Sequence, residues 1–258
     1  GAQLLPLFGG TGLAPIALYA RDRLREDGAA WAFVKSPSVF LFATGDGALQ
    51  LGCALGVALS LAVLFGVTNA VVQAVLWALY LSFVDVGQWF YGYGWESLLC
   101  EAAFLSIFLC PVRSLVPFPR AMPTPATLPW LFRWLVFRVM FGAGLIKLRG
   151  DPCWAHLTCL DVHYETQPSP SPLAFWLHHA PHWTHVAGVV VNHVVELVVP
   201  FLVFGPRRVR HPAGVALVAF QVLLIASGNL SFLNWLTIAV CLSCFDDAWL
   251  GRLVPAAL

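Results

Sequence analysis

The residues best suited to chemistry are concentrated in the stretch 138–168, RVMFGAGLIKLRGDPCWAHLTCLDVHYETQP. An apolar run carrying Arg138 and Lys147 breaks at Gly150-Asp151-Pro152. Titratable and hydrogen-bonding side chains then follow at high density: Cys153, His156, Cys159, Asp161, His163, Tyr164 and Glu165. Ionisable groups at membrane depth are costly and usually functional. We therefore expect the functional site to lie in or beside this stretch.

The composition of the chain indicates the environment, water or membrane, in which that stretch lies. Of 258 residues, 59% are hydrophobic and only 10% are charged, and the mean hydropathy is +0.79. Soluble domains carry about 25% charged residues. The sequence therefore predicts an all-α polytopic membrane protein, embedded in the lipid bilayer. The net charge of +1 argues against nucleic acid as a partner, because nucleic-acid binding requires a concentrated basic face.

Apolar segments long enough to approach the ~20 residues that cross a bilayer recur along the chain. About seven transmembrane helices are predicted, over residues 48–67, 70–86, 96–110, 128–148, 186–204, 212–227 and 230–245. Residues 47–258 then form one transmembrane domain, with a long polar loop at 149–185 that carries a short interfacial helix. Residues 1–46 form a separate interfacial or extracytoplasmic segment, and we expect a further helix upstream of it.

Orientation follows from the excess of lysine and arginine in cytoplasmic loops. One side of the predicted bundle collects Arg113, Arg120, Arg207, Arg208, Arg210 and Arg252. Placing that side in the cytoplasm makes loop 149–185 extracytoplasmic. The composition, rich in alanine, arginine and valine, is typical of bacterial proteins. We expect an integral protein of a bacterial inner membrane or, in a eukaryotic host, of the endoplasmic reticulum membrane.

Several ionisable residues fall within the predicted spans. Glu101 and Arg138 are interpreted as an ion pair that joins two helices, since polar residues commonly hold bundles together. His193 and Glu196 are three residues apart and share a helix face, which favours a polar cavity open to the outer side. Lys147 ends the fourth span, where it either snorkels to the interface or, desolvated by partial burial, serves as a base.

The two loop cysteines, Cys153 and Cys159, allow two interpretations. A structural disulfide fits an oxidising extracytoplasmic compartment. Thiol exchange is the alternative, but Cys-x5-Cys lacks the Cys-x-x-Cys spacing of thiol oxidoreductases. The structural bond is favoured.

The histidines after the loop resemble a metal cluster. His178, His182 and His185 would share a face on one continuous helix, with Asp161, His163 and Glu165 as further possible ligands. Pro181 instead predicts that two helices meet there, which would scatter the rings, and a metal site needs three or four convergent ligands. Interfacial histidines are the favoured interpretation. The sequence predicts no metal and no other cofactor.

Longer motifs resemble a known family. FGAGLIKLRGDPCW (141–154), LTCLDVHYETQP (157–168), PLAFWLHHAPHW (172–183) and NHVVELVVPF (192–201) are similar to the core of the lipase maturation factor family. The resemblance covers most of residues 90–205. It implies a polytopic membrane protein that assists the folding of secreted lipases, with an extracytoplasmic loop that binds clients. The polar C-terminal extension of longer members does not follow the seventh predicted span here.

The resemblance and the lack of a recognisable catalytic motif favour a non-enzymatic, chaperone-like maturation factor for lipase-like secreted hydrolases. Loop 149–185 would engage the client through an aromatic and polar set: Trp154, His163, Tyr164, Glu165, Phe175, Trp176 and Trp183.

A shorter pattern, Gly142, Gly144, Lys147 and Trp154, is similar to the vitamin K-dependent carboxylase superfamily (the HTTM proteins), in which the corresponding lysine is the catalytic base. This resemblance implies an alternative: an integral membrane enzyme acting on a lipid, quinone or peptide. Lys147 would be its base, and His163, His193 and Glu196 would line its cavity.

Overall fold

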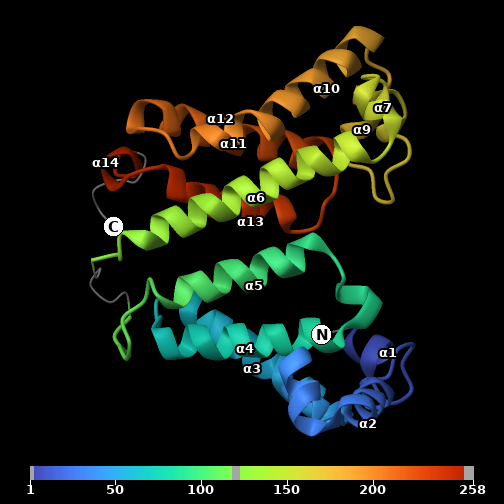
Figure 1. Cartoon of the computed structure of the whole chain (residues 1–258), viewed down its shortest axis with the longest axis vertical. Coiled ribbons are helices and arrows are strands. Elements are labelled where there is room, and N and C mark those ends of the chain that lie inside the picture. Colours follow the sequence, from blue (N-terminus) through green and yellow to red (C-terminus); the bar gives the residue numbers. More distant parts are fainter. Residues whose placement is uncertain (1–2, 118–122, 253–258) are drawn as a thin grey trace. The chain divides into compact units, whose positions relative to one another are not determined.

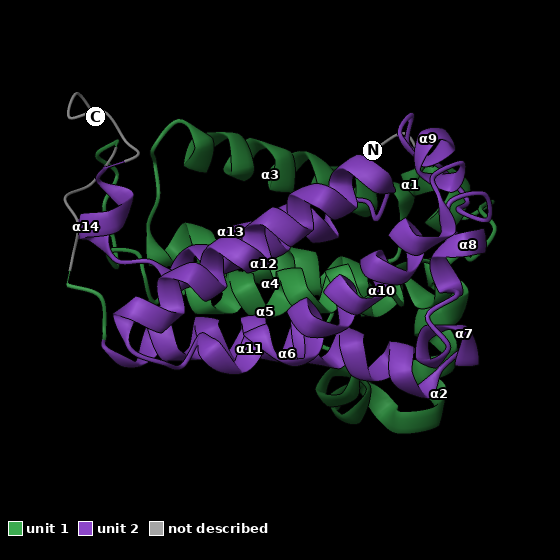
Figure 2. Ribbon diagram, turned by 90° about the horizontal axis from the view of Figure 1, so that it is seen from above, with its two compact units in different colours: residues 1–125 green, residues 126–258 purple. Residues whose placement is uncertain are grey.

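The computed structural model describes residues 3–117 and 123–252, and every regular element in these residues is a helix. The predicted all-α class is therefore confirmed. The chain divides into two compact units, residues 1–125 and 126–258, which Figures 1 and 2 show element by element and in separate colours. Arg120, one of the arginines used for orientation, lies outside the described residues.

The first unit holds the predicted hairpin of apolar helices. Its elements are α1 (Leu4–Phe8), α2 (Ile16–Lys35), η1 (Val39–Leu41), α3 (Asp46–Leu64), α4 (Ala70–Val86), η2 (Gln88–Tyr91) and α5 (Gly94–Ile107). Asn69 starts α4 by accepting a hydrogen bond from the backbone N–H of Val72, which satisfies a donor that the first turn leaves unpaired.

The N-terminal segment, residues 3–46, is largely helical. Helical structure continues to Lys35, with a break at Gly28, where φ is +70°. Glycine adopts this left-handed conformation without steric cost. The segment packs through Phe8, Ile16 and Phe40 onto Leu49 of α3 and Val86 of α4.

The second unit is built around one long helix, α6 (Thr127–Arg149), which packs against α10 and α13 (Figure 2). The other elements are α7 (Pro152–Ala155), α8 (Cys159–His163), α9 (Ala174–His178), α10 (His182–Leu197), α11 (Val199–Leu202), α12 (Arg207–Ser227), α13 (Leu233–Cys241), η3 (Leu242–Cys244) and α14 (Asp247–Leu250). α12 packs on α13.

Three helical stretches in the described residues are long and apolar enough to cross a membrane: Asp46–Leu64, His182–Leu202 and Arg207–Ser227. Two shorter apolar helices, Ala70–Val86 and Leu233–Cys244, accompany them. The membrane character expected from composition is thus upheld, whereas a count of seven spans stays a prediction.

Two local features differ from the sequence interpretation. The predicted polar loop 149–185 contains α7 and α8 in addition to one short helix, α9. Asp151 caps α7 by accepting from the N–H of Cys153, and Pro152 occupies its first turn, where the missing N–H costs nothing. The span predicted as continuous over 186–204 is divided between α10 and α11, because Pro200 cannot donate to the carbonyl four residues earlier.

Candidate functional site

A buried ion pair joins α6 to α10 in the second unit. The Lys147 Nζ atom donates to Glu196 Oε1 at 2.6 Å and to Asn192 Oδ1 at 2.7 Å. Asn192 and Glu196 are four residues apart and therefore lie on one face of α10. The Glu196 side chain is 3% exposed. A carboxylate this deeply buried needs a positive partner, so Lys147 is held inward rather than released to the interface.

Trp154 of α7 covers the ion pair. Its ring centre lies 4.9 Å from Lys147 Nζ, which is within range of a cation–π attraction. His193 Nε2 donates to the Trp154 carbonyl oxygen at 3.0 Å. α10 therefore supplies both the acceptors for the lysine and the contact that positions the tryptophan above it.

Gly144 permits the close approach of α6 and α10 that forms this pair. A Cβ atom at Gly144 would lie 2.6 Å from Leu197 Cδ2 and 3.1 Å from Glu196 Cβ, whereas a Cβ at Gly142 would meet nothing within 4 Å. Small residues let membrane helices approach closely. Gly144 is one turn before Lys147, so the contact places the ammonium beside the carboxylate.

A cavity of about 460 Å³ opens beside the ion pair. Its walls come from helices α6 to α10, α12 and α13 and from the connecting segments 164–168 and 228–230, and they are mostly apolar. The polar side chains of the lining are Lys147, His163, Tyr164, Thr166, Gln167, Asn192, Glu196, Gln221, Ser227, Asn229, Asn234 and Thr237. Three buried polar atoms of this lining lack a hydrogen-bond partner in the described structure: Glu196 Oε2, Asn192 Nδ2 and Gln167 Oε1. Unpaired buried polar atoms are costly, which suits a site that holds a polar ligand or water.

The structure places three of the four proposed catalytic residues on this cavity. Lys147, His163 and Glu196 line it. His193 is instead engaged with the Trp154 backbone. Burial, reinforced by the charge of Lys147, lowers the pKa of His163, which favours its neutral form.

Asn192 was missed as a site residue. Its spacing of four from Glu196, inside an apolar helix, was the available signal. Gln221 and Asn234 come from α12 and α13, and no local pattern connects them to Lys147.

The structure joins Cys153 and Cys159 in a disulfide. The bond ties α7 to the first residue of α8, so the segment that carries Trp154 is held to the segment that carries Asp161 and His163.

The residues proposed for client binding separate into two groups. Phe175, Trp176 and Trp183 are large exposed apolar side chains, the two tryptophans being 71% and 70% exposed. Trp154 and Tyr164 line the cavity instead, so the single exposed aromatic surface predicted from the sequence is divided between a surface and a pocket. Glu165 is exposed and pairs with His178, the Oε2 and Nε2 atoms lying 3.5 Å apart.

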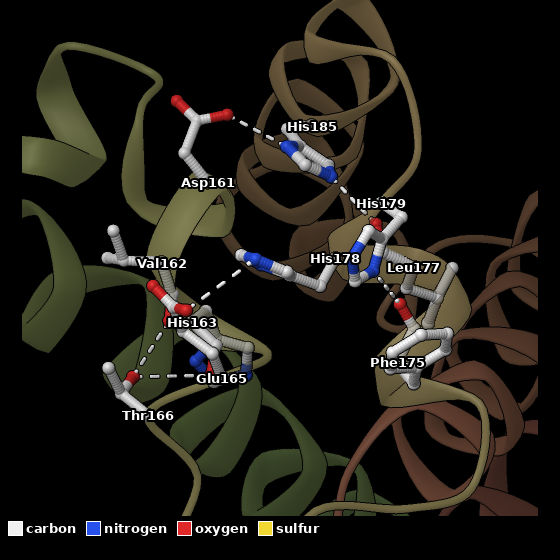
Figure 3. Close-up of polar contacts among 10 residues, drawn as sticks. All are labelled: Asp161, Val162, His163, Glu165, Thr166, Phe175, Leu177, His178, His179 and His185. Atoms are coloured by element: carbon white, nitrogen blue, oxygen red, sulfur yellow. Dashed lines mark hydrogen bonds and ion pairs between the residues drawn. The ribbon is translucent and has the colours of Figure 1, made fainter.

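The three histidines considered as a possible metal cluster, His178, His182 and His185, do not all lie together. Asp161, His182 and His185 bring their ligand atoms within 4.8 Å of one another. Figure 3 shows His185 directed at Asp161 while His178 points to Glu165. His178 therefore pairs elsewhere, because it lies on α9, which is separated from α10 by residues 179–181.

Glu101 lies on α5 in the first unit and Arg138 on α6 in the second, and their ion pair stays a prediction. The deeply buried carboxylate of the first unit belongs to Glu96, which accepts hydrogen bonds from the Tyr80 hydroxyl and from Trp95 Nε1.

The fold and site define a helical integral membrane protein whose second unit contains a mostly apolar cavity beside a buried ion pair. The family model described as the lipase maturation factor transmembrane domain matches residues 1–252. The chain belongs to the lipase maturation factor family, as its motifs indicated.

Named relatives agree with this assignment. Lipase maturation factor 1 of Bos taurus is 58% identical over 183 residues, 71% of this chain and 33% of the relative, and that of Homo sapiens is 56% identical over 183 residues, with 71% and 32% covered. Lipase maturation factor 2 of Rattus norvegicus is 42% identical over 186 residues, 69% and 26% of the two chains. The chain thus spans about a third or less of the relatives' length. No solved structure matches it.

Proposed function

We propose that this chain serves in the maturation of secreted lipases and engages client proteins through loop 149–185. The family membership and the names of the relatives support the role. The observation that supports the loop is the exposure of Phe175, Trp176 and Trp183 beside a rigid disulfide-tied segment. Aromatic residues are enriched at binding hot spots.

The topology that accompanies this proposal has seven spans: α3, α4, α5, α6, α10 with α11, α12, and α13 with η3. α6 has 23 residues, about 34 Å at 1.5 Å per residue, which matches the ~30 Å hydrocarbon core. Loop 149–185 is then extracytoplasmic, in the endoplasmic reticulum lumen or the bacterial periplasm, where its disulfide is stable.

Secretion of active lipase from cells that lack their own maturation factor tests the client surface. The double variant Trp176→Ser with Trp183→Ser should lower secreted lipase activity and co-purification of the lipase with this protein, at unchanged membrane abundance. Trp89→Ser is the matched control, since Trp89 is also a highly exposed tryptophan but lies in the first unit. Equal loss with the control, or no loss with the double variant, would contradict the proposed surface.

A second candidate function is supported by the cavity: enzymatic action on a lipid, quinone or peptide, with Lys147 at the reacting group. Lys147, Glu196 and His163 line one pocket that is mostly apolar, as binding sites for such molecules usually are. Because Lys147 donates to Glu196 and Asn192, it is arranged to bind or polarise an electron-rich group. To act as a base, the Lys147 ammonium must first lose a proton.

Lys147→Arg separates these candidates. Arginine retains the charge but cannot act as a base at ordinary pH. Lipase maturation that survives Lys147→Arg but is lost in Lys147→Met indicates a binding or structural cation. Loss in both variants, with membrane abundance and thermal stability retained, would support proton transfer by the lysine.

A further inference from the structure

A two-histidine, one-carboxylate cluster links α8 to the first turns of α10. His182 and His185 are three residues apart and share a face of α10. Their Nδ1 atoms lie 2.9 Å and 2.8 Å from the same atom, Asp161 Oδ1. One carboxylate oxygen thus receives two imidazole nitrogens, and all three ligand atoms lie within 4.8 Å of one another.

His185 is oriented as a metal ligand would be. Its Nε2 lies 2.8 Å from the carbonyl oxygen of Leu177, which only accepts hydrogen bonds, so Nε2 carries a proton. In the neutral ring, Nδ1 then presents its lone pair to the Asp161 carboxylate (Figure 3). A lone pair and a carboxylate oxygen this close repel each other unless a proton or a metal cation lies with them. Metal-binding histidines generally donate their other N–H to a carbonyl or carboxylate in this way.

One side of the cluster is buried and the other side is exposed to solvent. His185 is buried at 6% exposure, while His182 and Asp161 reach solvent, with side-chain exposures of 65% and 32%. Three protein ligands with one position left for water form the arrangement of open zinc sites. Imidazole nitrogen favours zinc and similar transition metals over magnesium or calcium.

We propose that Asp161, His182 and His185 form a Zn²⁺ site. The ion would join α8, which follows directly on the Cys153–Cys159 disulfide, to the start of α10. Leu160, His163 and Tyr164 of this segment line the cavity, so the metal and the disulfide together hold one wall of the cavity in place. The proposal stands independently of whether the loop binds clients, because it depends only on the three ligand residues.

Zinc titration of the purified full chain in detergent, after removal of bound metal with a chelator, tests the site. Isothermal calorimetry should show one saturable Zn²⁺ per chain, and zinc should raise the Tm, because a ligand that binds the folded state stabilises it. His182→Gln should weaken zinc affinity at least about tenfold, since even the loss of groups that only support metal ligands costs 10–100-fold. Asp161→Asn should act in the same direction.

His179→Gln is the matched control. His179 is a neighbouring exposed histidine whose Nδ1 contacts the Phe175 carbonyl, outside the three-residue cluster, and its loss should leave zinc affinity unchanged. Absence of saturable zinc binding to the wild-type chain would overturn the proposal. Equal affinity in the wild type and in both His182→Gln and Asp161→Asn would also overturn it, as would tighter binding of Mg²⁺ or Ca²⁺ than of Zn²⁺.

Discussion

Among the described residues, each unit buries one glutamate deeply, and the two carboxylates are paired in different ways. Both oxygens of Glu96 in the first unit accept hydrogen bonds, from the Tyr80 hydroxyl and from Trp95 Nε1. Glu196 in the second unit receives Lys147 at Oε1, while Oε2 has no partner within the described residues.

This difference indicates what each carboxylate is for. A fully paired buried acid stabilises and orients its helices, which is the role expected of Glu96. The incompletely paired Glu196 lies on a cavity beside a cation, an arrangement that leaves polar capacity for a ligand. Burial of a glutamate is therefore a weaker functional signal than the presence of an unpartnered oxygen on a cavity.

The largest loss of stability is expected when one member of the Lys147–Glu196 pair is removed. Glu196→Ala leaves a buried ammonium without its counter-charge, and we expect the free energy of unfolding in detergent to fall by about 3–5 kcal/mol. Glu96→Ala, which strands two neutral donors, should cost only about 1–3 kcal/mol. Equal losses of unfolding free energy in the two variants would show that the two carboxylates contribute equally to stability despite their different partners.

The disulfide is expected to have the next largest effect. Replacing Cys153 and Cys159 together with serine frees a small loop, and the loop-closure estimate gives a loss of about 2 kcal/mol. Alkylation followed by mass spectrometry should label neither cysteine before reduction. Partial labelling of the native protein would instead favour thiol exchange.

Packing at the ion pair is tested by two glycines on one helix. Gly144→Ala should destabilise the protein by about 1–3 kcal/mol, because the new methyl group collides with Leu197 and Glu196. Gly142→Ala is the control and should be neutral or slightly stabilising, since its Cβ meets nothing and alanine favours helix. The thermal unfolding of the two variants would coincide if α6 and α10 did not depend on close contact at Gly144.

The smallest effect is expected for Glu96→Gln. The amide oxygen can still accept one of the two hydrogen bonds, so the loss should be about 1 kcal/mol and lipase maturation should continue. A complete loss of maturation at normal membrane abundance would assign Glu96 a function and remove the contrast with Glu196.

The sequence alone predicted the features that depend on composition or on residues close together in the chain. Low charge and apolar segments predicted a helical membrane protein, and the i, i+3 spacing of His193 and Glu196 located polar residues on α10. The hydrogen-bond partners of those residues could be identified only from the three-dimensional structure. Asn192 takes one hydrogen bond of Lys147, and His193 turns to the Trp154 backbone, because the register of α6 against α10 is set by packing at Gly144.

The loop illustrates the same limit. Pro181 correctly indicated that two helices meet there, but the sequence does not show that His178 on α9 pairs with Glu165 while His185 on α10 pairs with Asp161. Pairings between separate helices have no signal in the periodicity of the sequence. Only one short helix is predicted in the loop, because α7 and α8, at four and five residues, are too short to show helical periodicity.

The most direct test of the cavity as the functional element is lipase secretion by the double variant Lys147→Met with Glu196→Leu. Replacing a buried ion pair with apolar residues of similar size is often neutral for stability or stabilising, so the variant should fold and reach normal membrane abundance. Our account predicts that secreted lipase activity nevertheless falls to near the level of cells without the protein. Full lipase secretion by this variant would contradict a functional role for the cavity.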